Sequence, residues 1–507
     1  MVYMTIQTPD WLKDAVFYQI FPDRFAKSER VKREGLKLEP WDTPPNPYGF
    51  KGGDLYGVIE KLDYLVDLGV NAIYFNPINA SASNHRYHTY DYFKIDPLLG
   101  GDEAFRDLLH AAHSRGMHIV PDGVFNHASR GFWQFHHVLE NGEGSPYVDW
   151  FYFDPERLKR HRPWGAYPDE REQQQLNNGV GSFDAIGYTA WWNLPALPKF
   201  NTQTQAVREF IFEVAEYWLR FGADGWRLDV PGEINDDSFW QEFRRRVKAV
   251  NPDAYIVGEL WLESQRWLKG DQFDAVMNYL VSAALMGWLI GDKMPEFAYR
   301  IGGLQRVMRP FSAAEFGDRI EYLLNLYDPE INYAQLNLLD SHDTPRFITT
   351  ASGDESALRL AYLFLFTFIG APCIYYGDEV GLDGGPDPEC RKSFPWDESR
   401  WNQGLHAYMK DLIHLRNAHP ALRRGSYKRI FSDNEALAFI RQYMGETYLV
   451  VINAGSKERQ LHLDLTQTGV SSRAVESLFG LGRATLEGGS LCIEHLPSRQ
   501  GVVYRLE

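Results

Sequence analysis

Cysteine is scarce in this chain, with three residues (Cys373, Cys390 and Cys492) among 507 and no C-x-x-C pair. Such a set argues against a disulfide framework and against a structural zinc site. The opening residues, MVYMTIQTPDWLKDAVFYQI, lack a basic segment followed by an apolar one, so no secretory signal is expected. The most apolar later run, ALRLAYLFLFTFIG at 357–370, is too short and too interrupted to span a bilayer. These absences predict a cytoplasmic protein without a membrane partner.

Positive charge is also in deficit. Lysine and arginine total 52 against 68 aspartate and glutamate residues, which gives a formal net charge of −16. A chain of that sign is not expected to bind nucleic acid or an anionic membrane. Aromatic residues reach 15%, which suits either large cores or flat stacking surfaces for an uncharged ligand. Composition alone does not distinguish these two interpretations.

Several catalytic motifs are missing from the sequence. No G-x-G-x-x-G loop follows the first predicted strand, which argues against a dinucleotide-binding fold. A G-x-S-x-G elbow, a His-x-His pair at a strand end and an obvious cysteine–histidine dyad are absent too. The sequence therefore offers no support for a serine or cysteine hydrolase, or for a barrel metallohydrolase.

What the chain does contain is an alternation of short apolar segments with longer segments of helical period. Val58, Ile59, Leu62, Leu65 and Val66 share one face of a predicted helix. A second helix, predicted over 204–221, repeats the pattern for three turns and ends at a glycine. Eight strands separated mostly by helices predict an α/β fold of the (β/α)8 barrel type. The predicted strands are 15–20, 71–77, 118–127, 225–230, 254–260, 273–279, 334–340 and 372–379.

Two further regions depart from this alternation. Residues 128–203, after the third strand, are rich in Trp, Tyr, Gly and Pro, and predict a small lobe over the barrel mouth. From about residue 425 the pattern changes to short alternating strands, which predicts a C-terminal antiparallel β-sandwich. The expected domains are thus a barrel over 1–127 and 204–424, an inserted lobe over 128–203 and a sandwich over 425–507.

The stretch DGWRLDVPGE at 224–233 places two charged residues in a strand that otherwise looks buried. Because alternate residues of a strand share a face, Arg227 and Asp229 should point into the barrel while Trp226, Leu228 and Val230 face the helices. Both charged residues lie at the carboxyl end of the strand, where barrel enzymes keep their active sites. Read alone, the pair could also be a satisfied buried ion pair.

Other strands end in the same way. The third ends in DGVFNH, with Asp122, Asn126 and His127, the fifth ends in GELW with Glu259, and the seventh leads into SHD at 341–343. A ring of carboxylates and histidines is costly to desolvate and does not help a core. Acid–base and nucleophilic chemistry requires such a ring. A set of carboxylates that needs no metal fits the cleavage of glycosidic bonds.

These segments resemble the α-amylase family of glycoside hydrolases, within it the neopullulanase, cyclomaltodextrinase and maltogenic amylase group. The resemblance runs from about residue 11 to the end of the chain, and LPKFN at 197–201 is similar to a marker of that group. Further matching segments are DGVFNH, GWRLDV, GELW, SHD, YQIFPDRF at 18–25, GGDLYGVIEKLDYL at 52–65, SNHRYHTYDY at 83–92 and GAPCIYYGDEVG at 370–381.

The resemblance implies a role for each site residue. Asp229 would be the nucleophile, Glu259 the general acid/base and Asp343 the stabiliser of the transition state. Arg227 would hold Asp229 ionised, with Asp122 as its structural partner. Four residues are expected to bind substrate: Tyr87, by stacking on the sugar being cleaved, together with His127, Arg227 and His342.

The same resemblance implies hydrolysis of α-1,4-glucosidic bonds in maltooligosaccharides, cyclodextrins or pullulan, with retention and some glycosyl transfer. One alternative is a debranching enzyme for α-1,6 bonds in short branched oligosaccharides. Another is a catalytically silent binding subunit, which the presence of all three carboxylates disfavours. No cofactor is expected to be obligatory, and calcium is left open at Asn126. The chain is expected to act as a monomer or homodimer.

The sequence departs from that group in three places. It reaches the first strand without the additional N-terminal β-domain that many members carry. His88 stands where an aspartate usually follows the stacking tyrosine, and Pro231, Gly232 and Glu233 replace a common Ala-Asn-Glu. These changes flank the expected sugar sites, so they bear on linkage preference rather than on the class of reaction.

Overall fold

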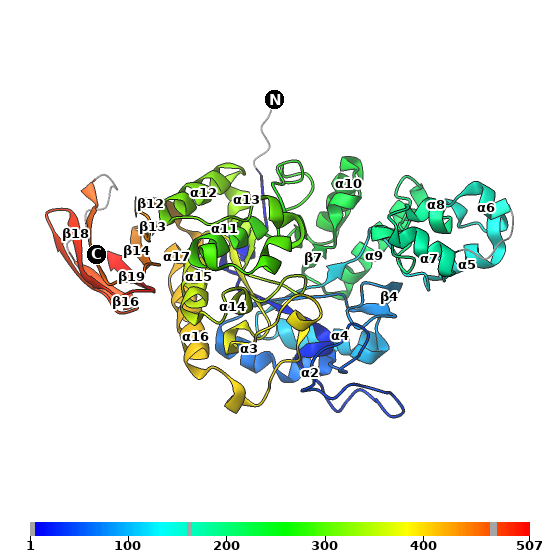
Figure 1. Cartoon of the computed structure of the whole chain (residues 1–507), viewed down its shortest axis with the longest axis horizontal. Helices are drawn as coiled ribbons and strands as arrows, with labels where there is room; N and C mark the ends of the chain where they lie inside the picture. Colours follow the sequence, from blue (N-terminus) through cyan, green and yellow to red (C-terminus); the bar gives the residue numbers. More distant parts are fainter. Residues whose placement is uncertain (1–5, 160–164, 467–473, 507) are drawn as a thin grey trace.

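The protein folds around a closed barrel of parallel strands, described here from a computed structural model over residues 6–159, 165–466 and 474–506 (Figure 1). Each strand of the barrel is short and buried. The barrel strands are β1 (Phe17–Ile20), β2 (Ala72–Phe75), β5 (His118–Val120) continued by β6 (Asp122–Gly123), β7 (Gly225–Leu228), β8 (Tyr255–Gly258), β9 (Ala275–Val276), β10 (Leu336–Leu338) and β11 (Ala371–Tyr375).

The pairing of these strands closes the barrel. One run of parallel pairs joins β10, β11, β1, β2 and β5, and a second joins β6, β7, β8 and β9. Pro121 separates β5 from β6, since proline has no N–H to give to the ladder. A parallel bridge between Met277 and Leu336 closes the gap between β9 and β10. The eight strands predicted from the sequence are therefore confirmed, and with them the (β/α)8 class.

Amphipathic helices surround the strands. Along α9, Val207, Ile211, Val214, Ala215 and Trp218 are buried at the predicted spacing. The helices outside the inserted lobe are α1 (Pro22–Phe25), α2 (Leu55–Glu60), α3 (Leu62–Leu68), α4 (Gly101–His113), α9 (Gln205–Phe221), α10 (Asp237–Val250), α11 (Tyr279–Leu289), α12 (Ala313–Asn325), α13 (Pro329–Ala334), α14 (Phe347–Thr350), α15 (Glu355–Thr367), α16 (Gln403–Ala418) and α17 (Pro420–Arg424).

Two details of the prediction were wrong. The first predicted helix is broken at Lys61 into α2 and α3, so Val66 leaves the buried face and is 43% exposed. Strand β7 ends at Leu228, and Val230 takes up a left-handed conformation with φ 37° instead of continuing toward the helices. The first break changes only the outer layer, whereas the second lies beside the carboxylates.

The inserted lobe and the sandwich lie at opposite ends of the molecule (Figure 1). Two short strands, β3 (Asn79–Ser81) and β4 (Thr89–Ile95), form a hairpin beside the barrel before the lobe begins. Within the lobe, Phe135, Phe151, Phe153 and Tyr188 make a small aromatic core. Its helices are α5 (Trp133–Asn141), α6 (Pro155–Lys159), α7 (Glu170–Asn177) and α8 (Ser182–Ile186).

The C-terminal region is a sandwich of two antiparallel sheets, ordered β12-β13-β14-β19-β16 and β15-β18-β17. Alternation along β13 explains its position: Ala438 and Ile440 face the second sheet, while Leu437 and Phe439 join the core of the barrel. The strands are β12 (Ser426–Ser432), β13 (Ala436–Tyr443), β14 (Glu446–Asn453), β15 (Arg459–Asp464), β16 (Val475–Phe479), β17 (Arg483–Glu487), β18 (Ser490–Leu496) and β19 (Gln500–Leu506).

The lobe and the sandwich confirm the predicted architecture, whereas the exact domain boundaries stay a prediction. Residues 1–5, 160–164, 467–473 and 507, which fall within the three expected domains, lie outside the described residues. Within the described part of the chain, no helix combines the length and the apolar character that crossing a membrane requires.

Candidate active site

Arg227 on β7 is the centre of the carboxylate cluster and has no exposed surface. Its Nη1 donates to Asp122 Oδ1 and Oδ2 at 3.0 and 2.8 Å, and to Asp229 Oδ1 at 3.1 Å. Its Nη2 lies 2.9 Å from Glu259 Oε2, at ion-pair distance but without hydrogen-bond alignment. The register brings these groups together, since Asp122 pairs with Arg227 across β6 and β7, and Glu259 follows β8. One guanidinium group therefore serves three carboxyl groups.

Glu259 is held by two further donors. Its Oε2 accepts the Val230 N–H at 3.1 Å, and its Oε1 accepts Trp261 Nε1–H at 3.1 Å. Trp261 in turn stacks on Tyr279 with ring centroids 3.9 Å apart. Burial raises the pKa of Glu259 to about 7, although the positive charge of Arg227 acts in the opposite direction. A carboxyl group with such a pKa can give and take a proton near neutral pH.

Burial, together with an excess of carboxyl groups over cations, explains why the cluster holds protons so tightly. Asp122, Asp229, Glu259 and Asp343 could contribute four negative charges, against the two positive charges of Arg227 and Arg391. Burial raises the pKa of Asp122 to about 6, and it raises that of Asp229 while Arg227 counters the effect. That Arg227 holds Asp229 ionised stays a prediction, because this cation is shared among three carboxyl groups and the protons belong to the whole cluster.

Asp343 lies across from this group, in the loop after β10. Its carboxylate contacts Arg391 Nη2 at 3.2 Å and His342 Nε2 at 3.1 Å, and its side chain is 32% exposed. Arg391 also donates from Nε to the His342 carbonyl at 2.9 Å. Asp343 is the most accessible of the four carboxyl groups, as a group that contacts a substrate hydroxyl would need to be.

A chain of hydrogen bonds connects His342 to Arg227. The amide nitrogen of Gln19 lies 2.9 Å from His342 Nδ1 and can only donate, so the ring proton is on Nε2. That proton faces the Tyr87 hydroxyl at 2.8 Å, and the hydroxyl donates to Asp122 Oδ2 at 2.8 Å. Burial lowers the pKa of His342, which keeps the ring neutral. The Tyr87 ring stacks on His342 with centroids 5.4 Å apart.

His127 follows β6 and contacts the inserted lobe through a bridge to Lys199. It is fully buried, and the Asn126 amide nitrogen lies 3.2 Å from its Nδ1, which places the ring proton on Nε2. That Nε2 has no partner in the protein, and burial lowers the pKa of His127 to about 3. The ring stacks on Trp191 with centroids 4.9 Å apart. His127 is therefore a neutral donor whose N–H remains available.

The structure brings together every predicted site residue, and it adds three that sequence reasoning missed. Gln19, Val230 and Arg391 each fix one of the expected groups. Gln19 carried a signal, since it is a polar residue near the end of the first predicted strand. Val230 had none, because a β-branched residue rarely adopts positive φ and only the backbone N–H acts. Arg391 comes from a loop whose path the sequence does not specify.

Calcium was left open at Asn126, and the described residues give that ion little to bind. Asn126 Oδ1 is buried without a partner, but one amide oxygen is far from the roughly six to eight oxygen ligands of Ca²⁺. Among these residues no group of three or more His, Cys, Asp and Glu side chains is placed to hold a metal ion. The acidic and histidine side chains described thus do not by themselves form a calcium site at this position.

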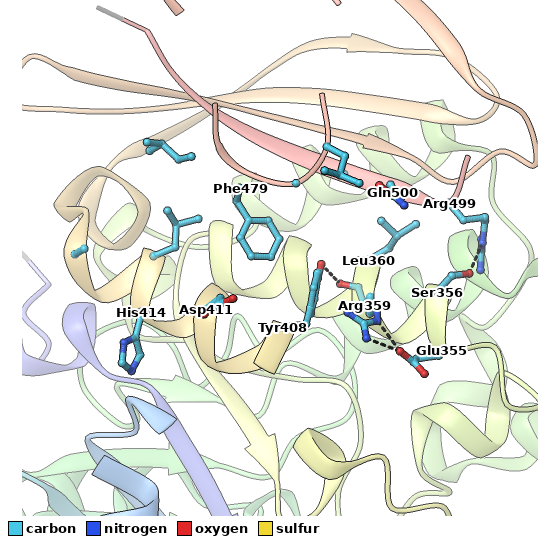
Figure 2. A pocket seen from close by; sticks show the side chains of 16 residues that line it. Glu355, Ser356, Arg359, Leu360, Tyr408, Asp411, His414, Phe479, Arg499 and Gln500 are labelled. Carbon is cyan, nitrogen blue, oxygen red and sulfur yellow. Dashed lines mark hydrogen bonds and ion pairs between the residues drawn. The ribbon is translucent and has the colours of Figure 1, made fainter. Parts of the chain in front are cut away.

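A separate cavity of about 860 Å³ lies between the barrel and the sandwich, away from the carboxylates (Figure 2). Tyr408 and Phe479 meet there edge to face, and Arg359 and Glu355 form an ion pair at its rim. Several of its polar groups are paired with one another, as Arg499 is with Ser356. The candidate active site is therefore the carboxylate cluster and not this cavity.

Known proteins resemble the chain over almost all of its length. The sequence profile of the alpha-amylase family, for its catalytic domain, matches residues 19–425. A cyclomaltodextrinase of Geobacillus thermopakistaniensis is 40% identical over 99% of this chain and 78% of its own. The structure of Ttha1563 from Thermus thermophilus superposes with a TM-score of 0.90 at 46% identity, covering 98% of this chain and 100% of that one. A debranching enzyme from Nostoc punctiforme gives 0.86 at 45% identity, covering 99% and 100%.

Proposed function

The chain belongs to the α-amylase family of glycoside hydrolases, and from that premise we propose how its carboxylates hydrolyse α-glucans. The proposal rests on the positions of Asp229 and Glu259, which follow the adjacent strands β7 and β8. The guanidinium group of Arg227 contacts both of them. A retaining glycosidase needs two carboxyl groups flanking one bond, about 5–5.5 Å apart. Neighbouring strands of one barrel supply such a pair.

In the first step, Asp229 attacks the anomeric carbon while Glu259 protonates the departing glycosidic oxygen. The bond from the anomeric carbon to that oxygen breaks as the bond to the carboxylate of Asp229 forms. Asp229 Oδ1 is engaged by Arg227, whereas Oδ2 has no partner in the protein, so we assign the attack to Oδ2. Glu259, with its pKa of about 7, supplies the proton.

In the second step, Glu259 takes a proton from water, and that water releases the sugar from Asp229 with the anomeric configuration retained. Asp343 and His127 are assigned to the hydroxyl groups of the same sugar. The free Nε2–H of His127 and the accessible carboxylate of Asp343 support this assignment. The ring nitrogens of His342 face Gln19 and Tyr87, so we assign His342 to orienting Tyr87 instead of to the expected sugar contact. Tyr87 is assigned to stacking on that sugar.

We assign α-1,4 bonds of maltooligosaccharides, cyclodextrins or pullulan as the main substrates, with some transfer to sugar acceptors. The similarity to a cyclomaltodextrinase over 99% of this chain supports that choice. Debranching at α-1,6 bonds is the second candidate, favoured by a match to a debranching enzyme that spans that whole chain. A cytoplasmic location and a monomeric or homodimeric state remain predictions from the sequence.

One comparison of products separates the two candidates. The enzyme is incubated in parallel with β-cyclodextrin, pullulan, maltoheptaose and a branched maltosyl oligosaccharide, and initial rates are followed by chromatography. Faster cleavage of maltoheptaose and β-cyclodextrin supports the α-1,4 assignment. Release of maltose only from the branched substrate would replace it with debranching, and no cleavage of any of the four would contradict both.

A further inference from the structure

Three aromatic rings form a continuous stack that runs from His127, in the segment that follows β6, to the surface of the lobe. His127 lies parallel to Trp191 with centroids 4.9 Å apart, and Trp191 lies parallel to Trp192 with centroids 4.5 Å apart. Exposure rises along the stack, from 0% at His127 through a half-buried Trp191 to 76% at Trp192. The outermost ring therefore presents a broad apolar face to solvent.

The backbone that carries this ring is held in an unfavourable conformation. Trp192 and Asn193 have φ values of 52° and 58°, in the left-handed region that side-chain-bearing residues seldom adopt. The Asn193 side chain secures the turn by accepting the Ser182 N–H at 2.9 Å and donating to the Val180 carbonyl at 3.4 Å. Strain of this kind is concentrated at functional sites. A tryptophan held in this way, and left exposed, has no role in the core of the lobe.

The position of the stack relates it to the substrate. Its inner ring, His127, is the proposed donor to the sugar being cleaved, and its outer rings extend from there to the exposed surface of the lobe. Trp191 Nε1 is buried without a partner and is a hydrogen-bond donor only. A pyranose offers both an apolar face of C–H groups and a rim of hydroxyl groups. The ring face and the free N–H together match those two features.

We propose that Trp191 and Trp192 form a binding platform for a glucosyl unit of the α-glucan beyond the sugar being cleaved. The exposed face of Trp192 stacks on the pyranose, and Trp191 Nε1–H donates to one of its hydroxyl groups. Asn193 is a positioning residue that keeps the turn in its strained shape. The inference rests on the proposed function, because it takes the substrate to be an oligosaccharide that passes His127.

The platform predicts a loss of affinity that depends on substrate length. In Trp192→Ala, KM for maltoheptaose should rise about 5- to 20-fold with kcat nearly unchanged, because binding is lost equally from ground and transition states. Hydrolysis of α-glucosyl fluoride, which has one sugar, should stay at the wild-type rate. Trp192→Phe should recover most of the affinity, and Trp191→Phe, which keeps a ring but removes the N–H, should raise KM less than Trp192→Ala.

Trp133→Ala is the matched control, since Trp133 is a 59% exposed tryptophan at the start of α5 in the same lobe. Melting temperature and size-exclusion profile are recorded for every variant. An unchanged KM in Trp192→Ala would overturn the proposal. An equal rise in KM in Trp133→Ala would overturn it too, as would a rise in Trp192→Ala that only follows a change in its oligomeric state. Turnover of α-glucosyl fluoride by the wild type tests the proposed function separately, so its failure is distinguishable from failure of the platform.

Discussion

At the scale of single residues, the central feature is the sharing of Arg227 among three carboxyl groups. Removing one member of a buried ion pair leaves an uncompensated charge, at a cost of about 3–5 kcal/mol. In this cluster one Arg227 cannot neutralise three carboxyl groups, so protons remain on some of them. Burial raises the pKa of Glu259 to about 7 for the same reason, because a buried charge is costly. The electrostatic arrangement that is costly to fold is also what prepares a proton donor for neutral pH.

That arrangement predicts the pH dependence of catalysis. Glu259 must be protonated to assist the leaving oxygen, so kcat/KM for maltoheptaose should fall as the pH rises through about 7. The ordinary pKa is 4.5, and a group without the shift would lose its proton well below neutral pH. Initial rates between pH 4 and 9 test this, and full activity on the alkaline side would contradict the assignment.

Glu259→Gln tests the same residue with two substrates whose leaving groups differ in their need for a proton. Loss of the acid should lower the rate on maltoheptaose by about 10²- to 10⁴-fold. Fluoride departs without a proton, so attack by Asp229 on α-glucosyl fluoride should survive, and azide should restore turnover because it needs no general base. An unchanged melting temperature serves as the control for folding. Loss of the reaction with fluoride and azide would mean that the variant has damaged more than the proton donor.

At the scale of secondary-structure elements, the buried Arg416 connects the ends of neighbouring barrel helices through main-chain carbonyl groups. Arg416 on α16 donates to the carbonyl oxygens of Phe366, Phe368, Gly370 and Leu422, at 2.7–3.1 Å. These acceptors lie near the carboxyl ends of α15 and α17, where helix carbonyls lack partners and a positive charge is favourable. The side chain thus satisfies four main-chain groups at once.

Arg416→Met should therefore lower the free energy of unfolding by about 3 kcal/mol or more, since several buried acceptors lose their donor. Arg423→Met is the control. Arg423 pairs with Asp14 near the surface, and such a pair is worth about 1 kcal/mol or less. Urea unfolding followed by tryptophan fluorescence compares the two. Equal effects would show that the carbonyl contacts of Arg416 do not stabilise the fold.

How much the sequence could predict also depends on the element. Arg227 and Asp229 could be placed in the barrel because strand alternation decides which face a residue takes, and the ends of parallel strands meet at one mouth. Arg391 could not be placed, since its contact with Asp343 depends on the path of a long loop after β11. The left-handed Val230 was missed because local preference predicts continued strand, and only the surrounding barrel forces the turn.

At the scale of the whole molecule, the barrel and the sandwich share one apolar core. One face of the first sandwich sheet packs into the barrel core through Leu437, Phe439, Val450 and Ile452. The other face of the same sheet forms the interior of the sandwich. Phe439 meets Phe364 of α15 edge to face at 5.7 Å. A sheet buried on both faces cannot separate from the barrel without exposing a large apolar surface.

The two regions should therefore unfold together. Differential scanning calorimetry is expected to give one transition for the barrel and the sandwich, because their contact is an extension of the core. Urea unfolding, followed separately through fluorescence and circular dichroism, should give coincident curves. Two well-separated transitions would contradict this and would mean that the shared core contributes little to stability.

The proposed mechanism requires Asp229 to become bonded to the sugar during the reaction, and mass spectrometry of the enzyme can detect that bond. Glu259→Gln is incubated with an α-maltosyl fluoride so that release of the sugar is slow, and the protein is digested with pepsin. One glycosylated peptide is expected, with the added mass on Asp229. A label on another residue, or products of inverted configuration without any label, would contradict it.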